Sequence, residues 1–384
     1  MKENYKGSGK MKVLHVISDE NIGGAGVLLG NLLTCLNKDK VDSIVALPNG
    51  SMLAPRLKKL NVPVRYLTKA CERVSPASVW ELSHIIKEDR VDIVHTNAAV
   101  SARIAARLSG VPVLHTRHCC FPHCGLLANP LVRYIAGIGN RLLSDHVIAT
   151  AEAAAQNLRE LGIPEGKMSI IINGSLPVRE VDQTVLDETR KRYGIRKGDF
   201  TVGICARLED CKGHDTFLAA ADILRRKNPE IPFRFLIIGD GNRRRELERL
   251  ADRLELTDCV IFTGFVSDMA PIYRILRINV NCSRGTETSC LAISEGMSVG
   301  LPTVASSYGG NVAMIGESGA GILFSVGDAE ALANAILKIA EDEEFEARMR
   351  VSARQRYHSH FTAEKMSREV ENVYESIAKR KSRS

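Results

Sequence analysis

A chain of 384 residues exceeds what one average hydrophobic core supports, so its length predicts two domains of about 150 to 200 residues each. Its composition, 45% apolar and 25% charged, excludes gross disorder, and no stretch approaches the roughly 18 uninterrupted apolar residues of a membrane span. The formal net charge of +7 lies in the first half: residues 1–180 hold 22 Lys and Arg against 15 Asp and Glu, whereas residues 181–384 hold 30 of each.

The N-terminus and the cysteines predict the cellular setting. Residues 1–10 include basic residues but no apolar run follows them, so we expect a loose leader rather than a secretion signal. The ten cysteines are scattered along the chain, which favours a reduced, cytoplasmic protein.

The first half alternates short β-branched runs with amphipathic helical stretches. This pattern is typical of a parallel, doubly wound sheet. The expected strands lie at residues 12–18, 42–48, 91–97, 111–118 and 168–175, with a strand that runs into a helix at 146–158.

The second half repeats the arrangement, which predicts a second α/β domain. Its expected strands lie at residues 200–208, 233–241, 259–266, 278–283, 302–306 and 321–326. We predict a first domain at 11–180, an interdomain linker at 181–199, a second domain at 200–355 and a C-terminal helix with a basic tail at 356–384, which packs back toward the first domain.

The turn after the first expected strand reads NIGGAGVLLG and includes the adjacent glycines Gly23 and Gly24. It does not match the dinucleotide fingerprint G-x-G-x-x-G, because Gly24 and Gly26 are followed by Leu29. The second strand also lacks the acidic residue that would hold a ribose. NAD binding is therefore not expected.

The basic excess of the first half is densest between Asp92 and Asp145, where five arginines and four histidines occur without an acidic residue. This predicts contact with phosphorylated ligands or with an anionic membrane face, and a merely solvated basic face is the alternative. Nucleic acid is not expected as a partner, because aromatic residues are few and no recognition motif accompanies the charge.

Histidines and cysteines gather near the ends of two expected strands in this basic segment. His95 and His118 each end a strand, where a histidine is either a satisfied core residue or a site residue. The run HCCFPHC at 118–124 lacks a second C-x-x-C pair, so we expect packing cysteines and no metal site. The segment 126–144 is apolar with two arginines and is either an interfacial helix or, as we slightly prefer, a packed core helix.

Two cations and two carboxylates mark the second half. Arg207 and Lys212 follow a strand, where two fixed cations can clamp a diphosphate, although a solvated loop would also contain them. Glu287 precedes a helix that we expect to begin near Ser289 or Cys290, and Glu295 lies about two turns further on. The unpaired amides at that helix start are suited to a phosphate.

The order of these motifs resembles one family. The pattern ARLxxxKG, then E-x7-E followed by GLPTVAS, with LIIGDG and VIFTGFV between them, is similar to the donor domain of the retaining, nucleotide-sugar-dependent glycosyltransferases of group 1. The resemblance covers nearly all of residues 200–330. It implies the GT-B fold, in which two Rossmann-like, doubly wound parallel-sheet domains face an interdomain cleft.

The resemblance also implies roles for individual residues. Catalytic roles fall to His118 and Glu287, and His95 and Arg117 are candidate acceptor-binding residues. Donor binding is implied for Gly23, Gly24, Arg207, Lys212, Cys290, Leu291 and Glu295, of which Glu295 would bind the ribose. The chain departs from many members at Thr288-Ser289-Cys290, where they carry a run such as Gly-Phe-Gly, so the fit of the donor sugar is less defined than that of the diphosphate.

The implied reaction moves a sugar from a UDP- or GDP-sugar to an acceptor hydroxyl with retention, without a metal or other cofactor. The basic first half favours a lipid-linked or anionic glycan acceptor, in polysaccharide, lipopolysaccharide or glycolipid assembly, and peripheral contact with the inner face of the plasma membrane. A sugar-nucleotide epimerase of the same fold and a non-catalytic nucleotide-sugar-binding scaffold are the alternatives.

Overall fold

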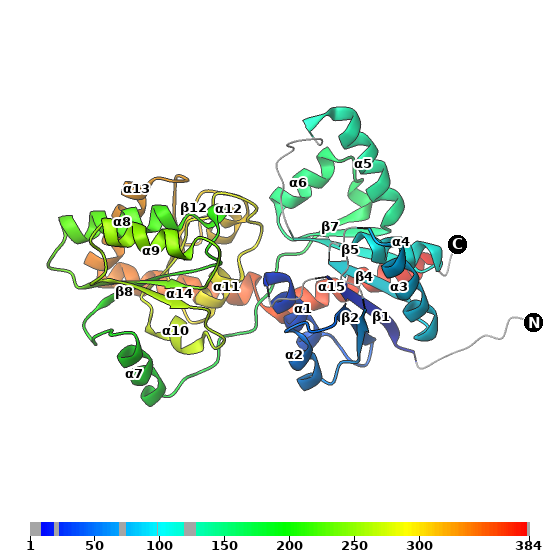
Figure 1. Ribbon diagram of the computed structural model, residues 1–384, viewed down its shortest axis with the longest axis horizontal. Helices are drawn as coiled ribbons and strands as arrows, with labels where there is room; N and C mark the ends of the chain where they lie inside the picture. Colours follow the sequence, from blue (N-terminus) through cyan, green and yellow to red (C-terminus); the bar gives the residue numbers. More distant parts are fainter. Residues whose placement is uncertain (1–8, 19–22, 69–73, 98, 119–127, 382–384) are drawn as a thin grey trace, which may run out of the picture. The chain divides into compact units, whose positions relative to one another are not determined.

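The structure of the protein is a computed structural model that describes residues 9–18, 23–68, 74–97, 99–118 and 128–381. The chain divides into two compact units: unit 1 comprises residues 1–174 and 363–384, and unit 2 comprises residues 175–362. Each unit is a parallel β-sheet with helices on both faces (Figure 1). This confirms the prediction of two Rossmann-like α/β domains with doubly wound parallel sheets.

In the described part of unit 1 the sheet has seven parallel strands in the order β3-β2-β1-β4-β5-β6-β7. The direction in which strands are added reverses between β1 and β4, so these two strands form the topological switch point. The strand bounds are β1 (Met11–Ile17), β2 (Val41–Pro48), β3 (Val64–Leu67), β4 (Ile93–Asn97), β5 (Val113–Arg117), β6 (His146–Ala149) and β7 (Met168–Ile170).

Helices cover both faces of this sheet. The buried side chains of α3 and α4 join Leu14, Val94 and Val113 in one apolar cluster, and α1 packs against α15. The bounds are α1 (Gly24–Cys35), α2 (Ala54–Lys59), α3 (Pro76–Glu88), α4 (Val100–Leu108), α5 (Pro130–Leu143), α6 (Glu152–Glu160) and α15 (Ala363–Lys381), with the short 3-10 helix η2 (Glu165–Lys167).

The last helix, α15, belongs to unit 1. Ser367 Oγ donates to Leu32 O at 3.3 Å, and Glu371 Oε1 accepts from the Asn37 backbone N–H at 2.6 Å. The segment predicted as one C-terminal helix, 356–384, is divided instead. Its first residues end α14 in unit 2, and α15 begins at Ala363 after a break at Phe361 and Thr362.

Sequence analysis did not predict β3. Its four residues VRYL include only one buried side chain, that of Leu67, because β3 is the edge strand of the sheet. A strand with so little buried surface leaves almost no apolar pattern in the sequence.

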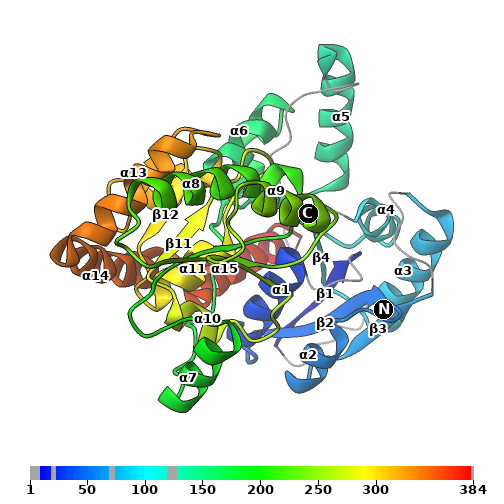
Figure 2. The same ribbon diagram turned by 60° about the vertical axis from the view of Figure 1, so that its left-hand side comes forward.

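The helix α5 is not the packed core helix that we preferred. Gly137 is its only fully buried residue, while Leu131, Tyr134, Ile135 and Leu142 are each more than half exposed. Figures 1 and 2 both show α5 standing away from the sheet of its own unit. In the described residues no helix is both long enough and apolar enough to cross a bilayer.

The sheet of unit 2 runs β10-β9-β8-β11-β12-β13, and its strands are parallel. The switch point lies between β8 and β11, where the direction of strand addition reverses. The bounds are β8 (Phe200–Cys205), β9 (Phe233–Ile238), β10 (Val260–Gly264), β11 (Ile278–Asn281), β12 (Thr303–Ser306) and β13 (Gly321–Phe324).

Two groups of helices enclose this second sheet. Figure 1 shows α8, α9 and α13 on one face, where their apolar residues pack with Val202, Phe235 and Val280; α10, α11 and α14 lie on the other. The bounds are α7 (Gln183–Arg192), η3 (Asp210–Lys212), α8 (His214–Lys227), α9 (Arg244–Arg253), α10 (Ala270–Ile275), α11 (Leu291–Ser298), α12 (Gly310–Ile315), α13 (Ala329–Glu341) and α14 (Glu343–His360).

Residues 181–199, predicted as a linker, contain α7 and belong to unit 2. Leu186, Tyr193 and Ile195 pack into an apolar cluster with Tyr273 and Ile275 of α10. The charged surface of α7 concealed this short apolar face in the sequence.

Candidate functional site

The loops at the carboxyl ends of β8 and β11 lie side by side, because these neighbouring strands are parallel. Arg207 and Lys212 follow β8, and Ser283 and Glu287 follow β11. Ligands of open parallel sheets bind at such a switch point, beyond the carboxyl ends of the strands. Sequence-predicted residues of unit 2 therefore gather at one edge of its sheet.

Lys212 and Glu287 form a buried ion pair at this edge. Lys212 Nζ lies 2.8 Å from Glu287 Oε2, with 18% and 9% of the two side chains exposed. The same carboxylate oxygen accepts a hydrogen bond from Ser283 Oγ at 2.8 Å. Burial opposes ionisation of Glu287, but the Lys212 charge and hydrogen bonds from Ser283 and Asn281 outweigh it and lower the pKa of the carboxyl group. Both partners are therefore charged at neutral pH.

The pKa of Lys212 shifts in the matching direction. Burial favours its neutral form, but the charge of Glu287 outweighs burial and raises the pKa above its ordinary value. The two shifts agree that each charge stabilises the other. A diphosphate that entered this edge would meet an ammonium group already held in place.

A polar network lies beneath Glu287, and sequence analysis missed it. Asn281 Oδ1 accepts from the Ser283 backbone N–H at 2.9 Å and from Asn311 Nδ2 at 3.1 Å. Ser306 Oγ donates to Ser283 O at 2.6 Å and accepts from Asn311 Nδ2 at 3.2 Å. These buried groups fix the start of the loop that carries Glu287. Asparagine at the carboxyl end of the apolar strand INVN was the signal in the sequence.

Arg284 joins the two loops of the edge. Its Nη1 lies 2.9 Å from Asp215 Oδ2, its Nη2 lies 2.6 Å from Asp210 Oδ1, and its backbone N–H donates to Cys211 O at 2.8 Å. The loop that carries Lys212 is thus tied to the loop that carries Glu287. This residue was not among the sequence predictions either.

Two adjacent glycines allow a close backbone approach beside Glu287. A Cβ atom on Gly310 would lie 1.2 Å from the carbonyl oxygen of Thr288, and one on Gly309, whose φ is +53°, would lie 2.2 Å from that of Glu287. The Gly310 N–H donates to Glu287 O at 3.3 Å. Only glycine allows the start of α12 to press against this loop.

The start of α11 lies where sequence analysis expected it. Cys290 is the N-cap residue and Leu291 is the first helical residue. Asn281 Nδ2 lies 3.2 Å from Cys290 Sγ, and burial raises the pKa of the Cys290 thiol to about 12, so the thiol stays protonated at neutral pH. Cys290 is thus a small, neutral residue at the N-cap position, and its side chain makes no capping hydrogen bond.

Glu295 and Arg207 are held differently. Glu295 Oε2 accepts a hydrogen bond at 2.8 Å from the hydroxyl of Tyr273, which is fully buried and was not among the sequence predictions. Arg207 has 71% of its side chain exposed and forms an ion pair with Glu209 at 2.8 Å. Glu295 is therefore fixed in position, whereas the Arg207 guanidinium is held only by a surface pair.

In unit 1 the predicted residues occupy the carboxyl ends of β1, β4 and β5. Gly23 is the N-cap of α1 with extended backbone, and a Cβ atom on Gly24 would meet nothing within 4 Å. The described residues of unit 1 therefore do not by their packing require a glycine at position 24. Arg117 Nη2 donates to Asn157 Oδ1 at 3.2 Å.

His118 contacts Asn97 at the ends of β5 and β4. His118 Nε2 lies 2.6 Å from Asn97 Oδ1, an amide oxygen that can only accept, so Nε2 carries the hydrogen. Burial lowers the pKa of His118 to about 4, which leaves the ring neutral at pH 7. Asn97 was not predicted from the sequence, and it defines which ring nitrogen of His118 is protonated.

His95 lies in the interior of unit 1, where it is 3% exposed. Its Nδ1 lies 2.6 Å from the hydroxyl of Tyr374 and its Nε2 lies 2.7 Å from Thr116 Oγ1. Both ring nitrogens therefore have partners within unit 1. His95 also lines a cavity of about 20 Å³ with Asn97 and Asn173, which is large enough for about one water molecule.

The run HCCFPHC had raised the question of a metal site. In the described ranges no group of three or more His, Cys, Asp or Glu side chains is placed to hold a metal ion. The cysteines and second histidine of HCCFPHC lie at 119–124, outside the described residues.

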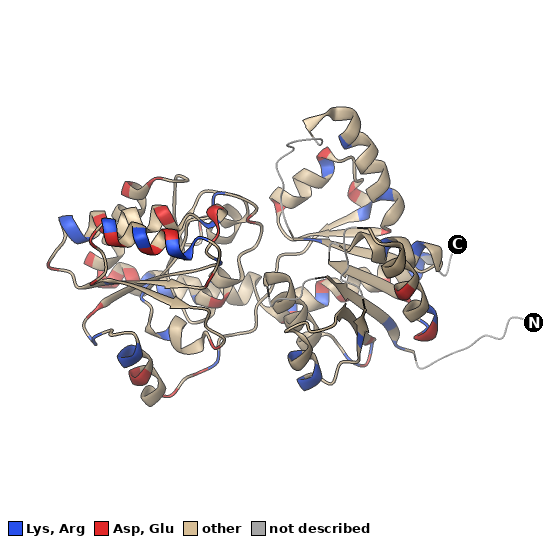
Figure 3. Ribbon diagram, viewed as in Figure 1, with Lys and Arg blue, Asp and Glu red and all other residues tan. Residues whose placement is uncertain are grey.

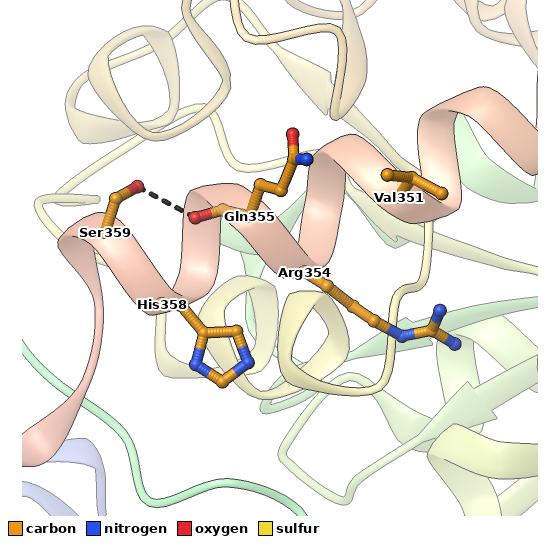
Figure 4. Close-up of a pocket in the computed structure, with 5 residues that line it drawn as sticks. All are labelled: Val351, Arg354, Gln355, His358 and Ser359. Carbon is orange, nitrogen blue, oxygen red and sulfur yellow. Dashed lines mark hydrogen bonds between the residues drawn. The ribbon is translucent and has the colours of Figure 1, made fainter.

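A hollow of about 610 Å³ on α14 has a different character. Its lining residues include Val351, Arg354 and His358, and Figure 4 shows that all the labelled side chains come from this one helix. A surface lined by a single helix does not bring together groups from several elements, as a catalytic site does.

Comparisons with known families match both units. The family described as Glycosyl transferases group 1 matches residues 186–356, and the one described as Glycosyltransferase Family 4 matches residues 22–175. The first match includes Arg207, Lys212, Glu287 and Glu295, and the second includes Gly23 and His118.

Two relatives have similar sequences. The UDP-Gal:alpha-D-GlcNAc-diphosphoundecaprenol alpha-1,3-galactosyltransferase of Escherichia coli is 28% identical over 279 residues, which are 69% of this chain and 70% of the relative. The N-acetyl-alpha-D-glucosaminyl L-malate synthase of Bacillus anthracis is 24% identical over 307 residues, 77% of this chain and 78% of the relative.

Solved structures share the fold. Anabaena Alr3699/HepE in complex with UDP-glucose superposes with a TM-score of 0.83 at 22% identity, over 95% of this chain and 100% of that one. A glycosyltransferase from Rickettsia africae superposes with a TM-score of 0.78 at 21% identity, over 96% and 98% of the two chains.

Proposed function

This chain belongs to the group 1 glycosyltransferases of the GT-B fold, and we propose that it transfers a sugar from a nucleoside diphosphate to an acceptor hydroxyl with retention and without a metal ion. The observation that carries the proposal is the Lys212–Glu287 pair at the switch point of unit 2. Its surroundings, the Asn281 network and the Gly309-Gly310 contact, hold both charges ready before any ligand arrives.

The proposed reaction breaks the bond between the anomeric carbon and the diphosphate oxygen and forms a bond to the acceptor oxygen. The leaving diphosphate gains negative charge, which Lys212, Arg207 and the amides at the start of α11 stabilise. The proton of the acceptor hydroxyl passes to a phosphate oxygen of the donor, so attack on the same face gives retention. Fixed cations here perform the electrostatic task for which a divalent metal could also serve.

The remaining site residues bind and orient. Glu287 contacts hydroxyl groups of the transferred sugar, and Glu295, held by Tyr273, binds the ribose hydroxyls. His118 is neutral and donates from Nε2 to Asn97, which orients its ring at the end of β5. Arg117 and His95 are the proposed acceptor-side residues. His95 acts through Thr116, because its own nitrogens are already engaged.

We propose a UDP- or GDP-sugar as the donor and a lipid-linked glycan as the acceptor, in the assembly of a surface polysaccharide, lipopolysaccharide or glycolipid. The Anabaena protein holds UDP-glucose, and the Escherichia coli relative is named for UDP-Gal and a diphosphoundecaprenol-linked sugar. Both names support a UDP-sugar as the donor, and the Escherichia coli name alone supports the lipid-linked acceptor.

We also propose that α5 rests on the anionic cytoplasmic face of a membrane. Leu131, Tyr134, Ile135 and Leu142 recur at the spacing of one helical stripe and are 59–68% exposed. The helix contains Arg133 and Arg141 and no acidic residue, which suits anionic lipids and opposes pairing with a second copy of the same helix. The variant Tyr134→Ser/Ile135→Ser should then lose sedimentation with phosphatidylglycerol vesicles. Unchanged sedimentation would reject α5 as the contact.

The transferase proposal is tested by donor binding followed by product analysis. UDP-, GDP- and ADP-sugars are screened by thermal shift, since a ligand at 100 times its Kd stabilises by about 2.7 kcal/mol. The stabilising donor is then incubated with and without a polyprenyl-diphosphate-linked sugar, and NMR of the product gives its anomeric configuration. Retention and acceptor-dependent turnover are expected. Fast conversion of the donor without acceptor would favour the epimerase, binding without turnover would favour the scaffold, and inversion would reject the mechanism.

A further inference from the structure

Unit 2 has a second polar pocket, at the edge of its sheet opposite to Lys212 and Glu287. It has a volume of about 350 Å³ and lies between the end of α7, the entry to β8, the connection from α10 to β11, and α14. Residues at the amino ends of β8 and β11 line it, whereas the donor residues follow the carboxyl ends. The six residues of β8 separate the two edges by about 16 Å, at about 3.3 Å per residue.

The lining of this pocket is strongly basic. It holds six cationic side chains and two carboxylates, and two of the six cations also pair with carboxylates outside the lining, Arg190 with Asp187 and Arg274 with Glu180. The cations are Arg190, Arg196, Lys197, Arg274, Arg277 and Arg350, and the carboxylates are Asp199 and Glu346. Figure 3 shows basic residues on α7, whose last turn is Arg190, Lys191 and Arg192.

The two carboxylates are already occupied by other groups. Glu346 is 3% exposed and is shared by Arg277 and Arg350, with Arg350 Nη2 at 2.8 Å from its Oε1. Asp199 Oδ2 accepts from the Arg196 backbone N–H at 2.8 Å and pairs with Arg234 Nε at 3.1 Å, a residue that does not line the pocket. Neither carboxylate is therefore available to neutralise the cations at the mouth.

Arg196 and Lys197 are the cations left over. Both are exposed, and no side-chain partner is found for either within the described residues. They lie between α7 and β8, so their backbone is anchored by Ile195 on one side and Phe200 on the other, both buried. Two exposed cations thus stand at the mouth of a pocket whose inner cations are held by ion pairs and ring contacts.

The inner wall is rigid. The guanidinium of Arg277 lies over the Phe200 ring, 4.5 Å from its centroid, and its backbone N–H donates to Thr201 O at 2.8 Å. Thr201 Oγ1 donates to Ile275 O at 2.5 Å, which ties β8 to the end of α10. Nε and Nη2 of Arg277 already donate to Glu346, so this fixed guanidinium can offer Nη1 to a ligand at little further cost in side-chain entropy.

We propose that this pocket binds a phosphate-bearing anion. Arginine forks match oxyanions with several oxygens, and two exposed cations beside an arginine-lined wall suit a multiply charged group better than a single carboxylate. The pocket is also too polar to favour an apolar ligand. The inference does not rest on the transferase activity, because it uses neither the donor residues nor unit 1.

The phosphate could be free or belong to a lipid headgroup, and the two sources have the same chemistry. Inorganic pyrophosphate is the soluble probe, and vesicles of phosphatidylglycerol, compared with pure phosphatidylcholine, are the lipid probe. The test variant is Arg196→Ala/Lys197→Ala, which removes the two exposed cations. The control is Arg245→Ala/Arg249→Ala, which removes two exposed cations from α9 of the same unit and so changes the net charge equally.

In isothermal titration with pyrophosphate, the wild type and the control should each show one more binding event than the test variant. If the test variant retains this event, its affinity at that site should be at least tenfold weaker. The donor clamp contributes equally to all three proteins, so its failure would lower every stoichiometry by one and leave the difference intact. With the Tyr134→Ser/Ile135→Ser changes of α5 present in all three proteins, a vesicle interaction lost only by the test variant would assign the phosphate to a lipid. If the test variant matches the control with both probes, the proposal is wrong.

A gain of affinity offers an independent check. Glu346→Gln removes the shared carboxylate but keeps its shape, so pyrophosphate should bind at least twofold tighter to this variant. Circular dichroism should first establish that the variant is folded. Weaker binding to a folded Glu346→Gln protein would contradict the proposed pocket.

Discussion

The two units present their candidate residues in opposite electrostatic states. In unit 2 the central residues are charged and compensated: Lys212 and Glu287 are paired at 2.8 Å and almost fully buried. In unit 1 the corresponding residues are neutral: His95 and His118 are engaged with hydroxyl and amide groups, and burial is the largest cause that lowers the pKa of each. The stability of unit 2 therefore depends on an intact ion pair, whereas that of unit 1 depends on histidines that stay unprotonated.

The largest effect should follow from separating the charge pair of unit 2. Lys212→Met leaves Glu287 buried without its cation, which should cost about 3–5 kcal/mol of unfolding free energy. Transfer should fall by a factor of about 1000, because a cation on the leaving diphosphate is lost. Urea denaturation and initial rates measure the two effects.

The double variant Lys212→Met/Glu287→Gln separates folding from catalysis. It removes both charges, so most of the lost stability should return while transfer stays low. If Lys212→Met is as stable as the wild type, the buried pair is not the compensated pair described here.

The next effect distinguishes the units by pH. Five histidines of unit 1 have pKa values lowered chiefly by burial: His15 and His115 to about 3, His118 and His146 to about 4, and His95 well below its ordinary value. In unit 2 His214 is lowered to about 4. Because the unfolded chain binds protons near pH 6.5 and the folded one does not, stability falls as pH drops from about 6.5 toward 4, by up to about 1.4 kcal/mol per pH unit for each histidine.

Hydrogen exchange at pH 7.5 and 5.0 should therefore show unit 1 losing protection before unit 2. Glu287 acts in the same direction but at lower pH: because its folded-state pKa is lowered, its contribution to stability is present above the ordinary carboxyl range and is lost as pH falls through that range. His115→Gln should reduce the pH dependence of unit 1, whereas His84→Gln, at an exposed site, should not. If the stabilities of both units depended equally on pH, the proposed electrostatic difference between them would be wrong.

A smaller effect should follow from Gly310→Ala. The added methyl would collide with the Thr288 carbonyl at 1.2 Å, so the loop of Glu287 must shift, at a cost of about 1–3 kcal/mol. Donor affinity should fall with it. Gly198→Ala is the control in the same unit, since neither glycine has a positive φ and nothing lies within 4 Å of the Gly198 Cβ position. Equal donor affinity in both variants would mean that the contact at Thr288 does not position the site.

The smallest effect concerns unit 1. Tyr374→Phe removes the hydroxyl next to His95 Nδ1 and leaves a buried ring nitrogen without this partner, which should destabilise unit 1 by about 1–3 kcal/mol. Protection of β4 and α15 should decrease in hydrogen exchange while that of unit 2 is retained. A loss confined to unit 2 would contradict the assignment of α15 to unit 1.

Elements with a clear apolar periodicity could be predicted from the sequence, whereas features that depend on tertiary contacts could not. The two parallel sheets followed from the repeated β-branched runs, but β3 was missed because it buries only Leu67. The segment of α7 was predicted as a linker, because its charged residues conceal the three apolar residues, Leu186, Tyr193 and Ile195, that pack against α10. For α5 the apolar stripe was visible in the sequence, but whether protein covers that stripe depends on the rest of the fold.

The same division holds for the site. Family motifs place four site residues at fixed intervals, so these could be identified from the sequence: Arg207, Lys212, Glu287 and Glu295. The residues that support them were not: Asn281, Asn311 and Arg284 come from separate elements and meet only in the folded unit. The role of Asn97 likewise could not be predicted, because it depends on a contact with His118, 21 residues away.

The central claim is that the edge of unit 2 holds a nucleoside diphosphate through Lys212 and its surroundings. Isothermal titration of UDP and GDP into the wild type and into the stability-matched Lys212→Met/Glu287→Gln variant tests it most directly. We predict that one of the two nucleotides binds the wild type and binds the variant at least tenfold more weakly. The same affinity in both proteins would contradict the account, because the diphosphate would then be held elsewhere.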